Sequence, residues 1–216
     1  MLLYYITDRS QFAGDEATRR SRLLATVAQA ARCGVDYIQL REKDLAPRKL
    51  ETLARAMVQC LRTENQKLKT ALLVNSRSDV ALASGAQGVH LRSNDISPSD
   101  VKDIWHRVGA APEEPTIGVS CHTRAEVVRA AQEGADFAVF GPVFGKEKSG
   151  ADPAGLDALR EACQEKIRVL ALGGVTLKNA EACVQAGAAG IAAIRLFQEN
   201  EMDEVVAALR RLTSDD

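Results

Sequence analysis

Three side chains that could bind an anion, Gln39, Arg41 and Lys43, lie at the end of an apolar run. The run is typical of a buried strand, and a strand points alternate side chains to opposite faces. The three side chains therefore share one face, where an amide and two cations suit a phosphate or pyrophosphate. The alternative interpretation is a solvated strand end at which Glu42 and Asp44 neutralise the two cations.

Two further segments contain groups that could bind or cover a phosphate. The pair Gly173-Gly174 follows an apolar run, where exposed backbone N–H groups bind phosphate in barrel enzymes. The alternative there is a tight turn that requires glycine for its dihedral angles. The glycine-bounded segment 141–150 carries Lys146 and Lys148, and we expect it either to close over a ligand or to form a solvated loop.

Of the three histidines, His122 is the best placed to transfer a proton. It follows an apolar run and opens an expected helix, where a neutral imidazole suits a general base. The alternative is a helix-entry residue that bonds only to backbone. His90 lies inside an apolar strand and is expected to be a core residue, whereas His106 lies late in a helix and is expected to face solvent.

A scaffold must bring these strand ends together, and strand and helix patterns alternate strictly along the chain. The expected strands cover residues 2–6, 36–40, 71–74, 88–91, 116–119, 137–140, 168–172 and 190–194. The expected helices lie near residues 15–32, 46–63, 77–84, 98–107, 123–133, 154–164, 177–186 and 201–212. Eight such units in about 200 residues are typical of a (β/α)8 TIM barrel, with an open doubly wound sheet as the alternative.

The barrel is favoured because no Gly-x-Gly-x-x-Gly follows the first strand, where Thr7-Asp8-Arg9-Ser10 stands instead. Helix-ending glycines are expected at positions 34, 85, 134 and 187. No linker divides the chain, so we expect one barrel domain over residues 1–216. Barrel active sites lie on the loops that follow the strands, which is where the polar residues above are found.

Composition argues against several other classes of function. A net charge of −1 gives no support to a nucleic-acid partner. No apolar run approaches the roughly 18 residues of a membrane span, and no basic leader precedes the first strand, so we expect a cytoplasmic protein without a membrane partner. Five cysteines without a Cys-x-x-Cys pair indicate neither a disulfide framework nor a zinc site. Small phosphorylated molecules are the expected partners, and the oligomeric state, a homo-oligomer included, stays open.

Short motifs occur in a fixed order along nearly the whole chain. They are Tyr5-Ile6-Thr7-Asp8, Gln39-Leu40-Arg41-Glu42-Lys43, Val74-Asn75, Gly88-Val89-His90-Leu91, Gly118-Val119-Ser120-Cys121-His122-Thr123, Phe140-Gly141-Pro142-Val143-Phe144 and Gly173-Gly174-Val175-Thr176. In this order they resemble the thiamine phosphate synthase and thiazole tautomerase family.

The resemblance implies a (β/α)8 barrel in thiamine biosynthesis. The synthase, a transferase, joins hydroxymethylpyrimidine diphosphate to thiazole phosphate and releases pyrophosphate, with Mg²⁺ and cations stabilising the leaving group. The positions that match the family are Gln39, Arg41, Lys43 and Asn75 for the diphosphate, Asp95 for Mg²⁺, and Ser120 and Gly174 for substrate contacts. We expect Lys43, Ser120 and His122 to be catalytic, and Gly173, Lys146, Lys148 and Arg195 to add to substrate binding.

The chain also departs from the family pattern. Ser76 stands where the synthases carry a second metal-binding Asp, and a hydroxyl is a far weaker Mg²⁺ ligand. The segment Gly145-Lys146-Glu147-Lys148-Ser149 replaces the usual Pro-Thr-x-Thr-Lys. Arg92 and Arg195 replace small or neutral residues, and we hypothesise that their charge partly compensates for weaker metal binding.

Three functions follow from this pattern. Synthase activity is favoured, because losing one carboxylate weakens Mg²⁺ binding without removing a pyrophosphate site rich in Arg and Lys. The second is thiazole tautomerase activity, a metal-independent proton transfer on thiazole phosphate carboxylate, for which His122 matches the acid/base position. The third is a barrel that binds thiazole phosphate without turnover.

Overall fold

The computed structural model describes residues 1–64, 70–145 and 153–213, and in this part of the chain the strands form a closed parallel barrel. Each strand pairs with its neighbour in the sequence, and the last pairs with the first. The strands are β1 (Leu2–Ile6), β2 (Tyr37–Leu40), β3 (Ala71–Asn75), β4 (Gly88–Leu91), β5 (Thr116–Cys121), β6 (Phe137–Phe140), β7 (Arg168–Leu172) and β8 (Gly190–Ala193). The predicted (β/α)8 barrel is confirmed, and the open sheet is wrong.

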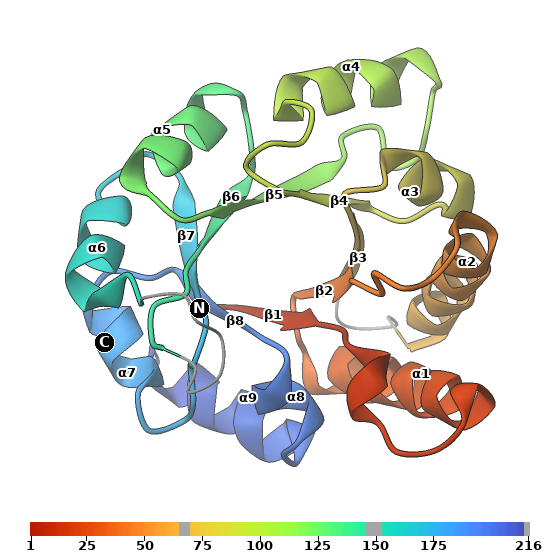
Figure 1. Cartoon of the computed structure of the whole chain (residues 1–216), viewed down its shortest axis with the longest axis horizontal. Coiled ribbons are helices and arrows are strands. Elements are labelled where there is room, and N and C mark those ends of the chain that lie inside the picture. The colour runs from red at the N-terminus through yellow and green to blue at the C-terminus, as the bar shows by residue number, and fades with distance from the viewer. Residues whose placement is uncertain (65–69, 146–152, 214–216) are drawn as a thin grey trace.

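Helices surround the ring of strands (Figure 1). They are η1 (Arg9–Gln11), α1 (Glu16–Cys33), α2 (Pro47–Glu64), α3 (Ser78–Ser84), α4 (Pro98–Arg107), α5 (Arg124–Gln132), α6 (Gly155–Ala162), α7 (Ala180–Gln185), α8 (Arg195–Gln198) and α9 (Met202–Arg211). The sequence patterns missed η1 and α8, because elements of three and four residues are too short to show a helical period. Within the described residues, no helix combines the length and apolar character needed to cross a membrane.

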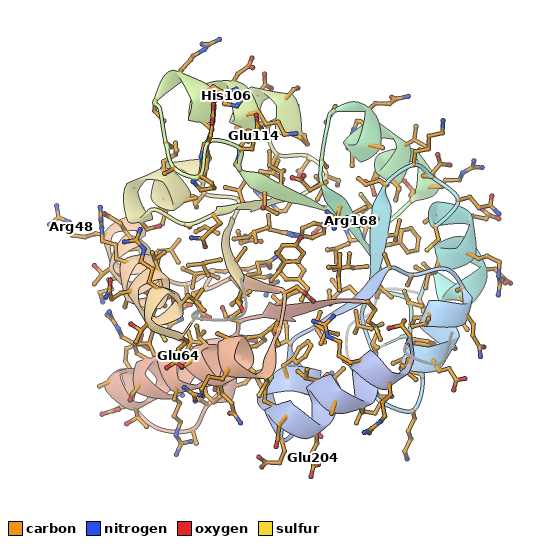
Figure 2. All side chains as sticks on the ribbon, turned by 180° about the vertical axis from the view of Figure 1, so that it is seen from behind. Arg48, Glu64, His106, Glu114, Arg168 and Glu204 are labelled. Carbon is orange, nitrogen blue, oxygen red and sulfur yellow. The ribbon has the colours of Figure 1, made fainter. Side chains whose placement is uncertain are left out.

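Apolar side chains pack on both faces of the strands, inside the ring and between the ring and the helices (Figure 2). Strand β1 shows the division, since Tyr4 and Ile6 belong to the inner cluster whereas Leu3 and Tyr5 belong to the outer one. This alternation follows from the period of a strand. The inner cluster closes the barrel below its mouth, so that the mouth has a floor.

Glycine is required at one point of this floor. A Cβ atom on Gly118 of β5 would lie 2.6 Å from the ring of Phe137 and 3.0 Å from Nδ1 of His90. The bare backbone therefore lets both rings pack against β5.

Four helices are followed by glycines in the left-handed conformation, as predicted. The φ angles are 85°, 71°, 83° and 100° at Gly34, Gly85, Gly134 and Gly187. Each helix returns the chain to the opposite end of the barrel, and the glycine that follows it lets the next parallel strand begin there. The carboxyl ends of the strands, with the loops that follow them, consequently meet at one mouth.

Candidate active site

The mouth of the barrel encloses a cavity of about 1680 Å³. Among the residues that line it are Gln39, Arg41, Lys43, Asn75, Ser120, His122, Gly173, Gly174 and Arg195. Asp95 lies instead in a small neighbouring pocket, and Lys146 and Lys148 lie outside the described residues. Most of the residues that we predicted for the site are thus brought together, although their roles stay predictions.

Two of the cavity cations, Arg41 and Lys43, make no ion pair with any described residue. The positive charge of Arg41, together with partial burial and the charge of Arg92, lowers the pKa of Lys43. The sequence alternative, in which Glu42 and Asp44 neutralise these cations, is wrong.

Both carboxylates bind Arg9 instead. The Arg9 guanidinium donates to Oε2 of Glu42 at 3.0 Å and to both oxygens of Asp44 at 2.7 Å. Glu42 also accepts a hydrogen bond of 2.6 Å from the Thr7 hydroxyl, whose oxygen in turn accepts the backbone N–H of Arg41 at 3.0 Å. This buried network joins the loops after β1 and β2 and fixes the backbone of Arg41. Sequence reasoning missed it.

A second buried network crosses the floor of the cavity. Gln39 Nε2 donates to the Tyr4 hydroxyl at 3.1 Å, which lies 3.1 Å from Nδ1 of His90, and Nε2 of His90 lies 2.8 Å from Oγ of Ser120. The prediction that His90 is a buried core residue is confirmed. Burial, reinforced by the charge of Arg41 and opposed by that of Asp95, lowers the pKa of His90 to about 3. The imidazole is therefore neutral at pH 7.

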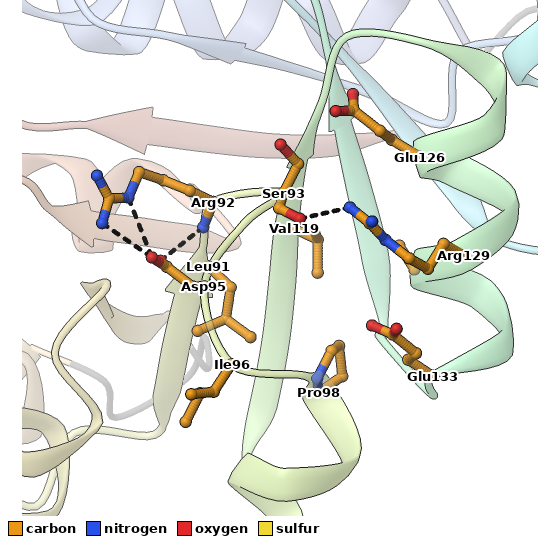
Figure 3. Close-up of a pocket in the computed structure, with 11 residues that line it drawn as sticks. Leu91, Arg92, Ser93, Asp95, Ile96, Pro98, Val119, Glu126, Arg129 and Glu133 are labelled. Atoms are coloured by element: carbon orange, nitrogen blue, oxygen red, sulfur yellow. Dashed lines mark hydrogen bonds and ion pairs between the residues drawn. The ribbon is translucent and has the colours of Figure 1, made fainter.

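The predicted metal ligand, Asp95, is already saturated by protein groups (Figure 3). Its Oδ1 accepts from Nε and Nη2 of Arg92 at 3.1 and 2.9 Å, and its Oδ2 accepts from the Arg92 backbone N–H at 2.8 Å and the Ser76 hydroxyl at 2.6 Å. Ser76 holds this contact with a left-handed φ of 55°, unusual for a residue with a side chain.

These donors do not suit Mg²⁺, which requires several oxygen ligands in octahedral geometry. One carboxylate paired with a guanidinium, plus one hydroxyl, supplies too little negative charge. Within the described ranges, no three His, Cys, Asp or Glu side chains converge as a metal site would require.

The glycine pair is the second group that we predicted to bind an anion, and its backbone conformation requires glycine. Gly173 and Gly174 adopt φ angles of 95° and 69°, and a Cβ on either would clash with Pro142 or Phe144. Their N–H groups donate no hydrogen bond to any described residue. Arg195, the first residue of α8, is exposed and also lines the cavity.

The His122 side chain has one nitrogen held by backbone. Its Nδ1 lies 2.5 Å from the carbonyl oxygen of Gly141, and because a carbonyl only accepts, Nδ1 carries the proton. In the neutral ring the other nitrogen, Nε2, is then a proton acceptor. The residue precedes the N-cap of α5, Thr123, and so lies just outside the helix that it was expected to open.

The closed (β/α)8 barrel has cations and an exposed glycine pair at its mouth. These features are typical of barrel enzymes that act on small phosphorylated molecules. The chain belongs to the thiamine monophosphate synthase family, whose family model matches residues 3–197. This membership supports an enzyme of the transferase class.

Individual relatives are similar over nearly their full length. The thiamine-phosphate synthase of Syntrophomonas wolfei is 37% identical over 214 residues, covering 97% of this chain and 95% of the relative. A protein of Geobacter sulfurreducens with the provisional name of thiamine-phosphate synthase is 42% identical over 195 residues. The match covers 89% of this chain and 84% of the relative. The solved thiamine phosphate pyrophosphorylase of Pyrococcus furiosus has a TM-score of 0.78 and 30% identity, covering 98% of this chain and 94% of that chain.

Proposed function

We propose that this protein is a thiamine phosphate synthase, which joins hydroxymethylpyrimidine diphosphate to thiazole phosphate and releases pyrophosphate. The observation that carries the proposal is that one cavity contains two separate groups of a chemical type that suits an anion. Arg41 and Lys43 stand on the β2 side, and the N–H groups of Gly173 and Gly174, which have no acceptor among the described residues, stand on the β7 side. A reaction between two phosphorylated substrates requires such a pair.

The cations act on the leaving group. The bond between the pyrimidine methylene carbon and the diphosphate oxygen breaks, and its electron pair leaves with the pyrophosphate. Arg41 and Lys43 stabilise the charge that develops there, because neither forms an ion pair with a carboxylate in the described part of the chain. The lone pair of the thiazole nitrogen then forms the new C–N bond. The glycine N–H groups hold the phosphate of the thiazole in place during this step.

We assign no step to Mg²⁺, although the family resemblance implies it. The Asp95 carboxylate is paired with Arg92, so the guanidinium occupies the place where a cation would otherwise bind. Arg92 also lies close enough to Lys43 to lower its pKa, which puts a third positive charge beside the diphosphate-binding group. We infer that the guanidinium of Arg92 supplies positive charge beside the diphosphate. In the synthases a second carboxylate, absent here, would help to bind a metal ion that supplies this charge.

The test incubates purified protein with both substrates and measures thiamine phosphate and pyrophosphate, at several Mg²⁺ concentrations and in EDTA. We expect product in every condition, with only a modest response to Mg²⁺. Lys43→Ala is expected to lower the rate, whereas Lys49→Ala, which removes an exposed lysine of α2, leaves it unchanged. If no product forms under any condition, the chain is not a synthase.

A second candidate is thiazole tautomerase activity, favoured by the fixed protonation of His122. With Nδ1 bound to the Gly141 carbonyl, Nε2 of the neutral ring has no partner in the described residues and can take a proton from a thiazole phosphate carboxylate, without metal. The conversion is followed by proton NMR, and His122→Asn is expected to slow it about 100-fold or more. An unchanged rate excludes His122 from the proton transfer. Binding of thiazole phosphate with neither reaction would instead indicate a barrel without turnover.

A further inference from the structure

The hydrogen-bonded chain under the cavity joins Gln39 to Ser120 through two buried rings. One of these, His90, also lines the cavity, but both of its ring nitrogens are bonded within the chain. Gln39 and Ser120 line the cavity at its ends, from β2 and β5. Tyr4 and His90 link them from β1 and β4, and at most 2% of either residue is exposed. The proposed chemistry assigns no role to these two linking side chains.

Once the Gln39 amide nitrogen is placed toward Tyr4, the chemistry of each group sets the direction of the proton in every further bond. The Gln39 amide nitrogen only donates, so the Tyr4 oxygen accepts from it. The Tyr4 proton must then go to Nδ1 of His90, because a protonated Nδ1 would leave that buried hydroxyl without an acceptor. The neutral ring consequently carries its proton on Nε2 and donates it to the Ser120 oxygen.

A reversed chain, with the Gln39 oxygen accepting from Tyr4, is also self-consistent, but the charges disfavour it. In the reversed chain the amide NH2 group would be the free end of Gln39, in a cavity wall that carries Arg41 and Lys43. In the first direction the free end is the carbonyl oxygen, which these cations attract. The two directions differ in the tautomer of His90, which can be measured.

We propose that Tyr4 and His90 are positioning residues that hold Ser120 as a hydrogen-bond donor toward the cavity, so that the site selects a ligand with an unprotonated acceptor atom there. The Ser120 oxygen accepts from His90, which leaves its own proton for the ligand. A ring nitrogen with a free lone pair is the matching ligand group. The choice of ligand rests on the proposed function, whereas the direction of the chain does not.

The direction is tested by ¹⁵N NMR of the imidazole nitrogens, with the His90 signals assigned by comparison with His90→Gln. We expect His90 in the wild-type protein to be neutral and protonated on Nε2 at pH 7. Tyr4→Phe removes the donor to Nδ1 and is expected to give a mixture of tautomers. Tyr5→Phe is a matched control, because the buried Tyr5 hydroxyl on the other face of β1 has no partner in the described residues. It is expected to leave the tautomer unchanged.

The action through Ser120 is tested by a double-mutant cycle on the affinity for thiamine phosphate, which carries both heterocycles. Tyr4→Phe is expected to raise the Kd about 10-fold in the wild-type background. In the Ser120→Ala background the same change is expected to alter the Kd less than about 2-fold, because the group through which Tyr4 acts is gone.

Each outcome decides the inference. Protonation on Nδ1 in the wild-type protein, or equal effects of Tyr4→Phe in the two backgrounds, overturns it. If thiamine phosphate does not bind at all, the proposed function fails, and the tautomer of His90 alone decides whether Ser120 is a donor.

Discussion

Two groups of charges lie next to each other at the end of β2, and they are built in opposite ways. Arg9 is buried and its guanidinium forms ion pairs with Glu42, Asp44 and Glu16, so that each charge in this group has an opposite partner. We call it the balanced group in this sense of pairing. Arg41 and Lys43 face the cavity, and neither forms an ion pair with any described residue. Residues adjacent in sequence thus serve separate purposes.

The pKa shifts show the same contrast. Hydrogen bonds from Arg9 lower the pKa of Asp44, as expected for a satisfied ion pair. The pKa of Lys43 is lowered chiefly by a like charge, that of Arg41, a repulsion that a bound anion would offset. We therefore expect the balanced group to stabilise the fold and the unbalanced group, Arg41 and Lys43, to bind a ligand.

The largest expected effect comes from breaking the balanced group. Glu42→Ala removes a carboxylate that is 2% exposed and leaves the Thr7 hydroxyl and the backbone N–H of Arg9 without this acceptor. We expect the free energy of unfolding to fall by about 3 kcal/mol. Urea denaturation measures this value. A variant as stable as the wild-type protein would show that the network is not a structural element.

Changes in the unbalanced group, Arg41 and Lys43, should affect ligand affinity and leave stability unchanged. Arg41→Gln is expected to raise the Kd for pyrophosphate about 10- to 100-fold, because a charge-assisted contact to the anion is lost, with stability unchanged. Isothermal titration calorimetry measures the affinity. The control is Arg168→Gln, which removes an exposed arginine at the amino end of β7, on the other side of the barrel (Figure 2). Equal losses in the two variants would mean that only net charge matters.

The sequence predicts this contrast only in part. The period of a strand is enough to place Gln39, Arg41 and Lys43 on one face, and the parallel barrel then brings them to the mouth. The binding partner of Glu42 could not be predicted, because Arg9 is 33 residues away and meets it only through the pairing of β1 with β2.

The floor of the cavity shows the same limit. His90 was expected in the core because its strand is apolar, and it is buried there. Its bonds to Tyr4 and Ser120 join residues 86 and 30 positions apart, which only the closed barrel brings together. A single polar atom on an apolar strand, such as the Tyr4 hydroxyl, gives no sequence signal that distinguishes it from that of Tyr5.

The buried, neutral His90 is expected to make the stability of the protein depend on pH. Its pKa is about 3 in the folded protein against an ordinary value of 6.5, lowered by burial and Arg41 against the opposing charge of Asp95. Below pH 6.5 the unfolded chain therefore binds the proton first, and the free energy of unfolding decreases as the pH falls toward 3. The contribution approaches about 1.4 kcal/mol per pH unit. His90→Asn should flatten the slope measured between pH 6 and pH 4.5, and an unchanged slope would contradict a buried neutral imidazole.

The smallest effect is expected at the outer edge of the balanced group. Asp44 binds Arg9 through both oxygens, but 68% of its side chain is exposed, so solvent screens the pair and can replace it. We expect Asp44→Asn to lower the free energy of unfolding by less than about 1 kcal/mol in urea denaturation, and to leave pyrophosphate affinity unchanged. A loss as large as that of Glu42→Ala would show that the number of carboxylates around Arg9, rather than their burial, determines the stability of this loop.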